Sequence, residues 1–296
     1  MSEKQTNRFE IKKKSKALSI VIAIVLIALV AVAAFYIVQR NASNVVTFGT
    51  TLKVHYSPSY AGEEKIIKFI DEHIAPDFGI KLEGVPLTDG TQADLAVAEG
   101  RFAASIYQHQ WWLKQVIEAT GFELTPTVEV FQWGFGLYSD KYASIDEIPN
   151  GALVALPADG ANQGQALWLL QRAGLLELNK EIETRTAKLK DITQNPHEFK
   201  FKEFELETLP RILDSVDVSI GYISNFDAGK VPRSKGLLFP EAPRTFACRL
   251  VIGTKYLNDP NIKKLIQAFS DPRLEQYLKT TDDPLVAGVL TAVSAN

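Results

Sequence analysis

The hydrophobic pattern begins with one long apolar run and then changes to short alternating periods. Between positions 17 and 38 the clearly polar members are Ser19 and Tyr36, and a bilayer core needs roughly 20 apolar residues. This run therefore predicts a transmembrane anchor over residues 17–39. From Thr51 onward, strand-like alternation and helical spacing follow one another.

Short strands that run into helices recur along the second part of the chain. Residues 51–56 alternate as a strand does, and residues 63–74 place isoleucines at helical spacing. The apolar segments 103–106 and 152–156 are each followed by a turn and a helical period. This order predicts an α/β fold with parallel βαβ units. Glycines interrupt a later strand pattern at 134 and 136, where we expect the chain to cross between lobes.

The charges around the apolar run orient it. The first 16 residues carry six Lys or Arg and two Glu, so the positive-inside rule predicts a cytoplasmic tail over 1–16 and an extracytoplasmic domain beyond the anchor. A cleaved signal peptide is the alternative, because 31–33 (AVA) has the form of a cleavage site, although a signal's apolar region is normally about 7 to 15 residues long. Lipid attachment would need a Cys just after this run, and the one Cys is Cys248.

Composition narrows the possible partners. A single Cys cannot form an internal disulfide, so the exported part must fold on its hydrophobic core. After residue 40 the chain carries 25 basic and 33 acidic side chains, and this acidic balance argues against nucleic acid as a partner.

One segment concentrates candidate binding chemistry. Tyr107, His109, Trp111 and Trp112 follow a short apolar strand, and open α/β sheets place ligands beyond the carboxyl ends of their strands. Aromatic walls with a few polar tips are typical of small-molecule pockets. Packing of these rings in the core is the alternative.

Catalysis is the weakest interpretation. The four His are scattered without metal-pair spacing, and there is neither a nucleophile elbow nor a P-loop in the sequence. We therefore expect no catalytic residue, no metal and no cofactor.

Three segments together resemble a known family. They are residues 107–113 (YQHQWWL), 153–175 (LVALPADGANQGQALWLLQRAGL) and 206–214 (LETLPRILD). In order and spacing they are similar to the NlpA (MetQ-like) family of methionine-binding proteins. The resemblance spans roughly residues 50–285 and implies a two-lobed periplasmic-binding-protein fold of type II.

We expect a tether over 40–50, lobe 1 over 51–138 and 245–296, and lobe 2 over 139–244. Family members are usually lipid-anchored through an N-terminal Cys, which a transmembrane helix would replace here.

The resemblance also implies ligand contacts. Tyr107, His109 and Trp112 match the family's contacts around the methionine side chain, and Asn162 matches an Asn before the lobe 2 helix. Backbone N–H groups at that helix start would suit an anionic ligand group, although an ordinary turn or N-cap would also explain the Asn.

Three positions depart from the family pattern. Gln165 replaces the Arg that binds the ligand carboxylate, Ser224 with Asn225 beside it replaces a later Asn, and Gly90 aligns with an aromatic contact. A neutral amide in place of a guanidinium should weaken carboxylate binding by about ten- to a hundredfold. Either another cation compensates, or the ligand is not a free α-amino acid.

The sequence thus favours a substrate-binding component of an ABC transporter. We expect it to be tethered to the cell membrane by a single span, to bind methionine or a related amino-acid-like compound by hinge closure, and to deliver it to an ABC permease. A ligand-sensing or degenerate module that signals to a membrane partner is the alternative, because the altered clamp and a retained helix fit it as well.

Overall fold

The computed structural model describes residues 26–32 and 47–293. Residues 26–32 are helical and form part of a unit distinct from residues 47–296. Within the described residues, no helix combines the length and apolarity needed to cross a membrane. The predicted tail over 1–16 lies outside the described residues, as do most of the predicted anchor over 17–39 and of the tether over 40–50.

Lobe 1 is built on a six-stranded sheet with the order β13-β4-β12-β3-β1-β2. β1 pairs in parallel with both β2 and β3, and β12 runs antiparallel to β3 and β4. The strands are β1 (Thr51–Tyr56), β2 (Lys81–Pro86), β3 (Ala104–Ser105), β4 (Leu124–Trp133), β12 (Cys248–Gly253) and β13 (Leu290–Thr291).

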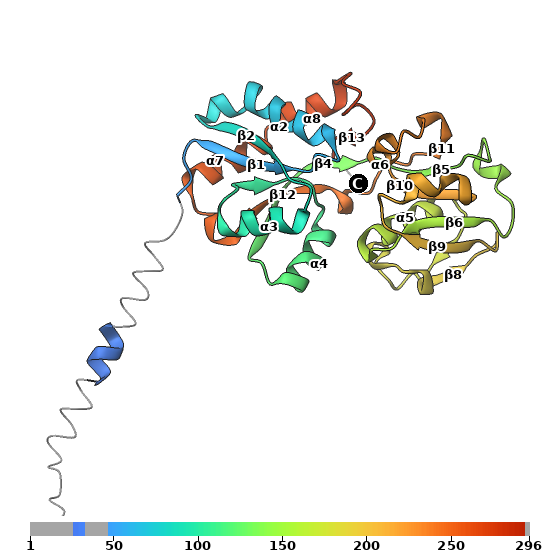
Figure 1. Cartoon of the computed structure of the whole chain (residues 1–296), viewed down its shortest axis with the longest axis horizontal. Helices are drawn as coiled ribbons and strands as arrows, with labels where there is room; N and C mark the ends of the chain where they lie inside the picture. The colour runs from blue at the N-terminus through green and yellow to red at the C-terminus, as the bar shows by residue number, and fades with distance from the viewer. Residues whose placement is uncertain (1–25, 33–46, 294–296) are drawn as a thin grey trace, which may run out of the picture. The chain divides into compact units, whose positions relative to one another are not determined.

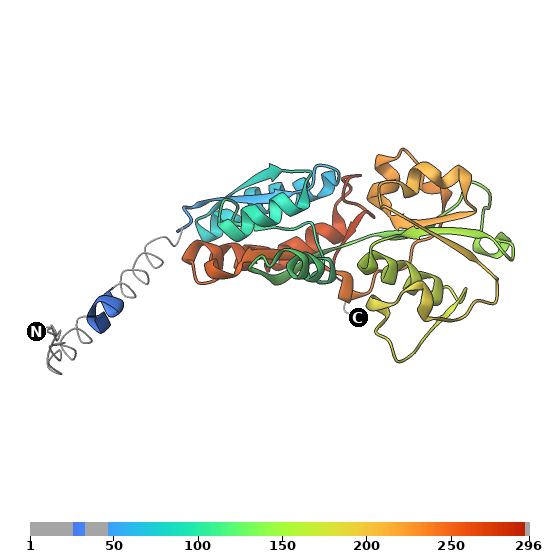
Figure 2. The same ribbon diagram turned by 60° about the horizontal axis from the view of Figure 1, so that its bottom comes forward.

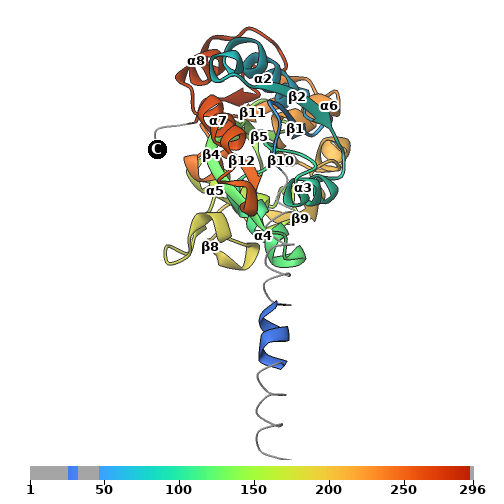
Figure 3. The ribbon, with the colours of Figure 1, turned by 90° about the vertical axis from the view of Figure 1, so that its left-hand side faces the viewer.

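Helices cover both faces of this sheet (Figures 1 and 3). The helices α2 (Ala61–His73), α7 (Pro260–Phe269) and α8 (Pro272–Thr280) contribute apolar side chains to the main core. The helices α3 (Gly90–Glu99) and α4 (Gln110–Thr120) contribute to a separate cluster against β4 and β12. Burial of one apolar face per helix is what fixes each helix on the sheet.

Lobe 2 is built on a five-stranded sheet with the order β11-β5-β10-β6-β9. Its strands are β5 (Phe135–Tyr138), β6 (Leu153–Pro157), β9 (Lys200–Phe204), β10 (Val218–Tyr222) and β11 (Gly236–Leu238). β7 (Glu177–Leu178) and β8 (Ile192–Gln194) form a separate hairpin. The helix α5 (Gly160–Arg172) supplies the largest buried face, and the short α6 (Ile223–Ala228) follows β10 directly.

The chain crosses from lobe 1 to lobe 2 at Gly134, between β4 and β5. Figure 2 shows this green segment running from one lobe into the other. β4 belongs to the first sheet and β5 to the second, so the crossing lies four residues before the expected boundary after Tyr138. A Cβ at Gly134 would lie 2.6 Å from Ile223 Cδ1 and 3.2 Å from Gly288 O, so any larger residue would require the Ile223 side chain to move. The return crossing lies between β11 and β12, a stretch that contains the expected boundary at 244/245.

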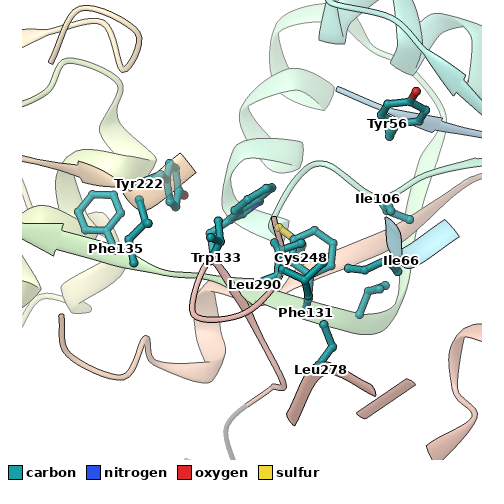
Figure 4. Packing of buried hydrophobic residues seen from close by; sticks show 14 of the residues in the cluster. Tyr56, Ile66, Ile106, Phe131, Trp133, Phe135, Tyr222, Cys248, Leu278 and Leu290 are labelled. Atoms are coloured by element: carbon teal, nitrogen blue, oxygen red, sulfur yellow. The ribbon is translucent and has the colours of Figure 1, made fainter. Parts of the chain in front are cut away.

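Aromatic side chains continue the core through this crossing. Figure 4 shows Trp133 with Tyr222 on the lobe 2 side and Phe131 and Cys248 on the lobe 1 side. The rings of Trp133 and Phe131 meet edge to face at 5.3 Å, and those of Phe135 and Tyr222 at 4.9 Å. The two lobes therefore share one apolar cluster beside the hinge.

Candidate functional site

A cavity of about 420 Å³ lies between the two lobes. Its wall is formed mainly by residues that directly follow strand ends, as expected for open α/β sheets. In lobe 1 these are Ser57, Tyr60, Leu87, Thr88, Tyr107, Gln108, His109 and Trp112. In lobe 2 they are Asp159, Asn162, Glu205, Leu206, Glu207 and Tyr222.

The structure brings four of the seven expected ligand contacts to this cavity. Tyr107, His109 and Trp112 line it from lobe 1, and Asn162 lines it from lobe 2. The lining does not include Gln165, Ser224 or Asn225. All three of these are buried beside it at the start of α5 and in α6.

Tyr107 presents its ring to the cavity because its hydroxyl is bound on the lobe 1 side. Tyr107 Oη donates to Asp94 Oδ2 at 2.9 Å, and Gln108 Nε2 donates to Asp94 Oδ1 at 2.7 Å. Burial raises the pKa of Asp94 to about 7, although both hydrogen bonds act in the opposite direction. A Cβ at Gly90 would lie 2.6 Å from Tyr107 Oη. The tyrosine hydroxyl thus occupies the space next to this glycine, where the family has an aromatic contact.

His109 is the N-cap of α4 and faces the other lobe. Its Nδ1 accepts from Trp112 N at 3.3 Å, so the proton lies on Nε2, which donates to Asn162 Oδ1 at 3.3 Å. Burial lowers the pKa of His109 to about 4, so the ring is neutral near neutral pH. Gln108 O also accepts from Arg249 N at 3.0 Å, which ties this turn to β12.

Asn162 is the centre of the lobe 2 wall. Its Oδ1 accepts from Tyr222 Oη at 2.6 Å as well as from His109, and its Nδ2 donates to Asp159 Oδ2 at 3.0 Å. Tyr222 Oη also lies 3.3 Å from Gln165 Oε1. Gln165 therefore supports the wall through Tyr222, whereas the resemblance places a carboxylate-binding group at this position.

Ser224 and Asn225 lie on the hinge side of the site. Ser224 Oγ and Asn225 Oδ1 are buried without a hydrogen-bond partner in the structure. Burial raises the pKa of Tyr60, and a hydrogen bond from Asn225 opposes that shift. Asn225 of lobe 2 thus contacts a lobe 1 tyrosine that lines the cavity.

The helix start that we expected to bind an anion is occupied by an acidic side chain. Asp159 is the N-cap of α5, and its Oδ1 accepts from Asn162 N at 2.9 Å. A carboxylate here satisfies an unpaired backbone donor and interacts favourably with the helix dipole. The backbone environment at the start of α5 is therefore stabilised by the chain itself.

Sequence reasoning missed several residues of the lining. Tyr60, Trp133 and Tyr222 add three rings to the cavity, and Tyr222 is the last residue of β10. His55 also lines the cavity, and its ring meets that of Tyr107 edge to face at 5.3 Å. Applying the strand-end rule to every parallel strand would have found Tyr222 and the loop that contains Tyr60.

The cavity combines aromatic rings with a few polar side chains, which is typical of a small-molecule binding site. No set of three His, Cys, Asp or Glu that could hold a metal occurs among residues 26–32 and 47–293. Cys248 is fully buried, and burial raises the pKa of its thiol, so it is an unreactive part of the core. Since Cys248 lies inside β12, it is also no lipid attachment site.

Sequence relatives agree with a binding role. The D-methionine-binding lipoprotein MetQ of Salmonella typhi is 29% identical over 232 residues, which cover 77% of this chain and 85% of the relative. Lipoprotein 28 of Escherichia coli K12 is 28% identical over 223 residues, which cover 74% and 82%. These relatives are named for binding or lipid attachment and not for catalysis, which agrees with the expectation that the chain is not an enzyme.

Solved structures share the fold. A nutrient-binding protein from Burkholderia cenocepacia bound to methionine superimposes with a TM-score of 0.68 at 24% identity, over 82% of this chain and 100% of that one. A methionine-binding lipoprotein candidate from Bacillus subtilis superimposes with a TM-score of 0.72 at 23% identity, over 83% and 98%. The chain therefore has the two-lobed α/β fold of periplasmic binding proteins.

The model of one protein family, described as NlpA lipoprotein, matches residues 58–288. This match covers most of both lobes, including the walls of the cavity. The chain thus belongs to the NlpA lipoprotein family.

Proposed function

We propose that this protein is the extracytoplasmic substrate-binding component of an ABC transporter, and that it binds methionine or a related small amino-acid-like compound. The observation that carries the proposal is the convergence of Tyr107, His109, Trp112 and Asn162 on one cavity. The volume and the aromatic lining of this cavity are typical of small-molecule sites.

Closure of the two lobes would retain the ligand. The hydrogen bond from His109 to Asn162 joins the lobes across the cavity, and Gly134 offers a flexible crossing point. A ligand that contacts both walls stabilises the closed arrangement over the open one, and its affinity depends on that difference.

The proposed tether is the apolar segment 17–39. The family takes its name from lipoproteins, yet the one Cys of this chain is the buried Cys248. The length and flanking charges of the apolar segment suit a single membrane span with the binding domain outside. Extraction tests this proposal: the full chain should remain in the membrane fraction after alkaline carbonate treatment, and its release would contradict the tether.

Ligand binding can be tested by calorimetric titration of the purified full-length chain with methionine enantiomers and related amines and amides. We expect saturable binding of at least one compound, and Trp112→Ala should weaken it about tenfold or more, since a buried aromatic contact is lost. Trp168→Ala is the matched control, because Trp168 lies in α5 and does not line the cavity. Absence of binding across the whole series would contradict the proposed function.

A ligand sensor is the second candidate. Gln165 supports it, because a site without the family's cation need not serve nutrient uptake. Uptake of labelled ligand by cells with and without the chain separates the two functions. Import requires that uptake falls when the chain is deleted, whereas a sensor would leave uptake unchanged.

A further inference from the structure

The cavity lacks the Arg that Gln165 replaces, and its wall also carries several acidic side chains. Asp159, Glu205 and Glu207 line the cavity, and of the described residues in its wall none is Lys or Arg. None of these three acidic side chains forms an ion pair within residues 47–293. The two histidines in the wall, His55 and His109, add no positive charge near neutral pH, because burial lowers the pKa of both. A carboxylate ligand would therefore meet repulsion rather than a counter-ion.

Three of the helix starts near the cavity are capped by side chains of the protein. Asp89 caps α3 through Gln92 N at 3.0 Å, His109 caps α4, and Asp159 caps α5. A helix N-terminus is the usual backbone site for an anionic group. Since a side chain of the protein caps each of these three helices, they offer a ligand carboxylate little compensation for the missing guanidinium. The start of α2, whose N-cap is the lining residue Tyr60, carries no such cap.

The acidic side chains act on the aromatic wall. Burial raises the pKa of Tyr60, and the charge of Glu207 raises it further. Burial likewise raises the pKa of Tyr222, and the charge of Asp159 contributes. Negative potential therefore reaches rings on both sides of the cavity, and aromatic faces attract cations through their own quadrupole.

We propose that the cavity selects a small organic cation with an apolar body and no free carboxylate, such as a thioether amine. This inference rests on the proposed function and narrows its substrate class. The ammonium group would lie towards Asp159, Glu205 and Glu207, and the apolar body would lie among the rings of Tyr107, Trp112 and Trp133.

One lysine near the site could in principle bind a ligand carboxylate, which is the alternative to a cationic ligand. Lys188 Nζ lies 4.0 Å from the position of a Cβ at Gly160, close to the start of α5. Lys188 is exposed and does not belong to the cavity wall. If it reached inward to bind a carboxylate, it would replace the family's Arg, so the test has to include this residue.

The test compares three ligands that share one side chain. They are methionine, the amine formed by its decarboxylation, and the acid in which hydrogen replaces its ammonium group. Titration of the full-length chain should show the amine binding at least about tenfold more tightly than methionine, and the acid should not bind. Tighter binding of methionine would overturn this inference and support the proposed function. Binding of the acid alone would also overturn the inference, as would silence from all three ligands. Silence across the whole series of amino acids, amines and amides would in addition contradict the proposed function.

Variants locate the charge that is responsible. Glu207→Gln should weaken amine binding about threefold, less so at high salt because the residue is exposed. Glu83→Gln is the matched control, since Glu83 is exposed on β2 away from the cavity.

Lys188→Met should leave amine binding unchanged. A loss of methionine binding in that variant, with methionine the tighter ligand, would identify Lys188 as the substitute cation and refute the inference.

Discussion

The two walls of the cavity are held in place in different ways. In lobe 1, Tyr107 is bound by Asp94 of the same lobe, which does not line the cavity. In lobe 2, Asn162 is bound by Asp159 and Tyr222, which line the cavity themselves. The lobe 1 wall is thus pre-formed by groups that a ligand does not touch. The lobe 2 wall depends on groups that a ligand can perturb, so sequence changes there alter specificity most directly.

The largest expected effect concerns the support behind the lobe 1 wall. Unfolded Asp94 loses its proton near pH 4, whereas the folded chain holds it to about pH 7. Stability therefore falls as the pH rises from 4 to 7, by up to about 4 kcal/mol. Asp94→Asn should remove this decline in urea unfolding followed by Trp fluorescence. Asp146→Asn, at an exposed position, should keep it, and an unchanged profile in the Asp94 variant would contradict the assignment.

His109 should show the opposite pH dependence. Unfolded His109 takes up a proton near pH 6.5, and the folded chain resists protonation until about pH 4. The stabilising contribution is complete above pH 6.5 and is lost as the pH falls towards 4, by up to about 3 kcal/mol. His109→Gln should therefore be less sensitive to acid than the wild type in the same unfolding assay. The exposed His73→Gln is the control, and equal acid sensitivity in all three proteins would disprove this role.

A smaller loss of stability is expected when Asn162, at the centre of the lobe 2 wall, is replaced. Asn162→Ala removes the acceptor of Tyr222 and His109 and a donor to Asp159. The cost should be about 2 kcal/mol of unfolding free energy, because buried polar groups lose partners. Asn179→Ala removes one exposed hydrogen bond, to Glu181 N, and should cost less than about 0.5 kcal/mol. Similar losses of unfolding free energy in the two variants would show that the hydrogen bonds around Asn162 do not stabilise the fold more than one exposed hydrogen bond does.

The smallest effect concerns a contact that joins the lobes outside the cavity. The Arg185 guanidinium lies 3.4 Å from the ring centre of Trp111, and Trp111 Nε1 donates to Thr245 O. Arg185→Gln should weaken ligand affinity about fivefold, because closure loses a cation–π contact worth about 1 kcal/mol. Arg172→Gln removes the comparable contact with Trp168 inside α5. Equal losses from both substitutions would contradict a role in closure.

Much of the fold was predictable, because the spacing of apolar residues along the chain indicates which side of each strand or helix is buried. The strand over 51–56 follows directly from the sequence pattern and appears as β1. The lobe 2 helix was expected to begin after Asn162, whereas α5 begins at Gly160 and includes this residue. The crossing at Gly134 lies at one of the two glycines where the sequence predicted it, four residues before the domain boundary that was placed after Tyr138. Alternation continues through Gly134, so the exact boundary depends on which distant strands each segment pairs with. Four ligand contacts reached the cavity because each of them follows the end of a strand.

Other parts of the site depend on contacts that no local pattern reveals. Asp94 lies within α3, where a polar residue usually faces solvent, and its burial follows from its bonds to the turn after β3. Gln165 was expected to face the ligand, yet Tyr222 from a strand 57 residues further along contacts it first. The acidic lining likewise arises where β6 and β9 end side by side in the sheet.

The single cysteine gives this protein a built-in reporter. Cys248 pairs through its backbone with His109 beneath the lobe 1 wall, and its side chain has no exposed surface. A thiol-reactive dye can label the folded chain only at this sulfur, and only when the packing around it opens. The rate of labelling, followed with and without a bound molecule, therefore measures how often the interior becomes accessible, without any engineered substitution.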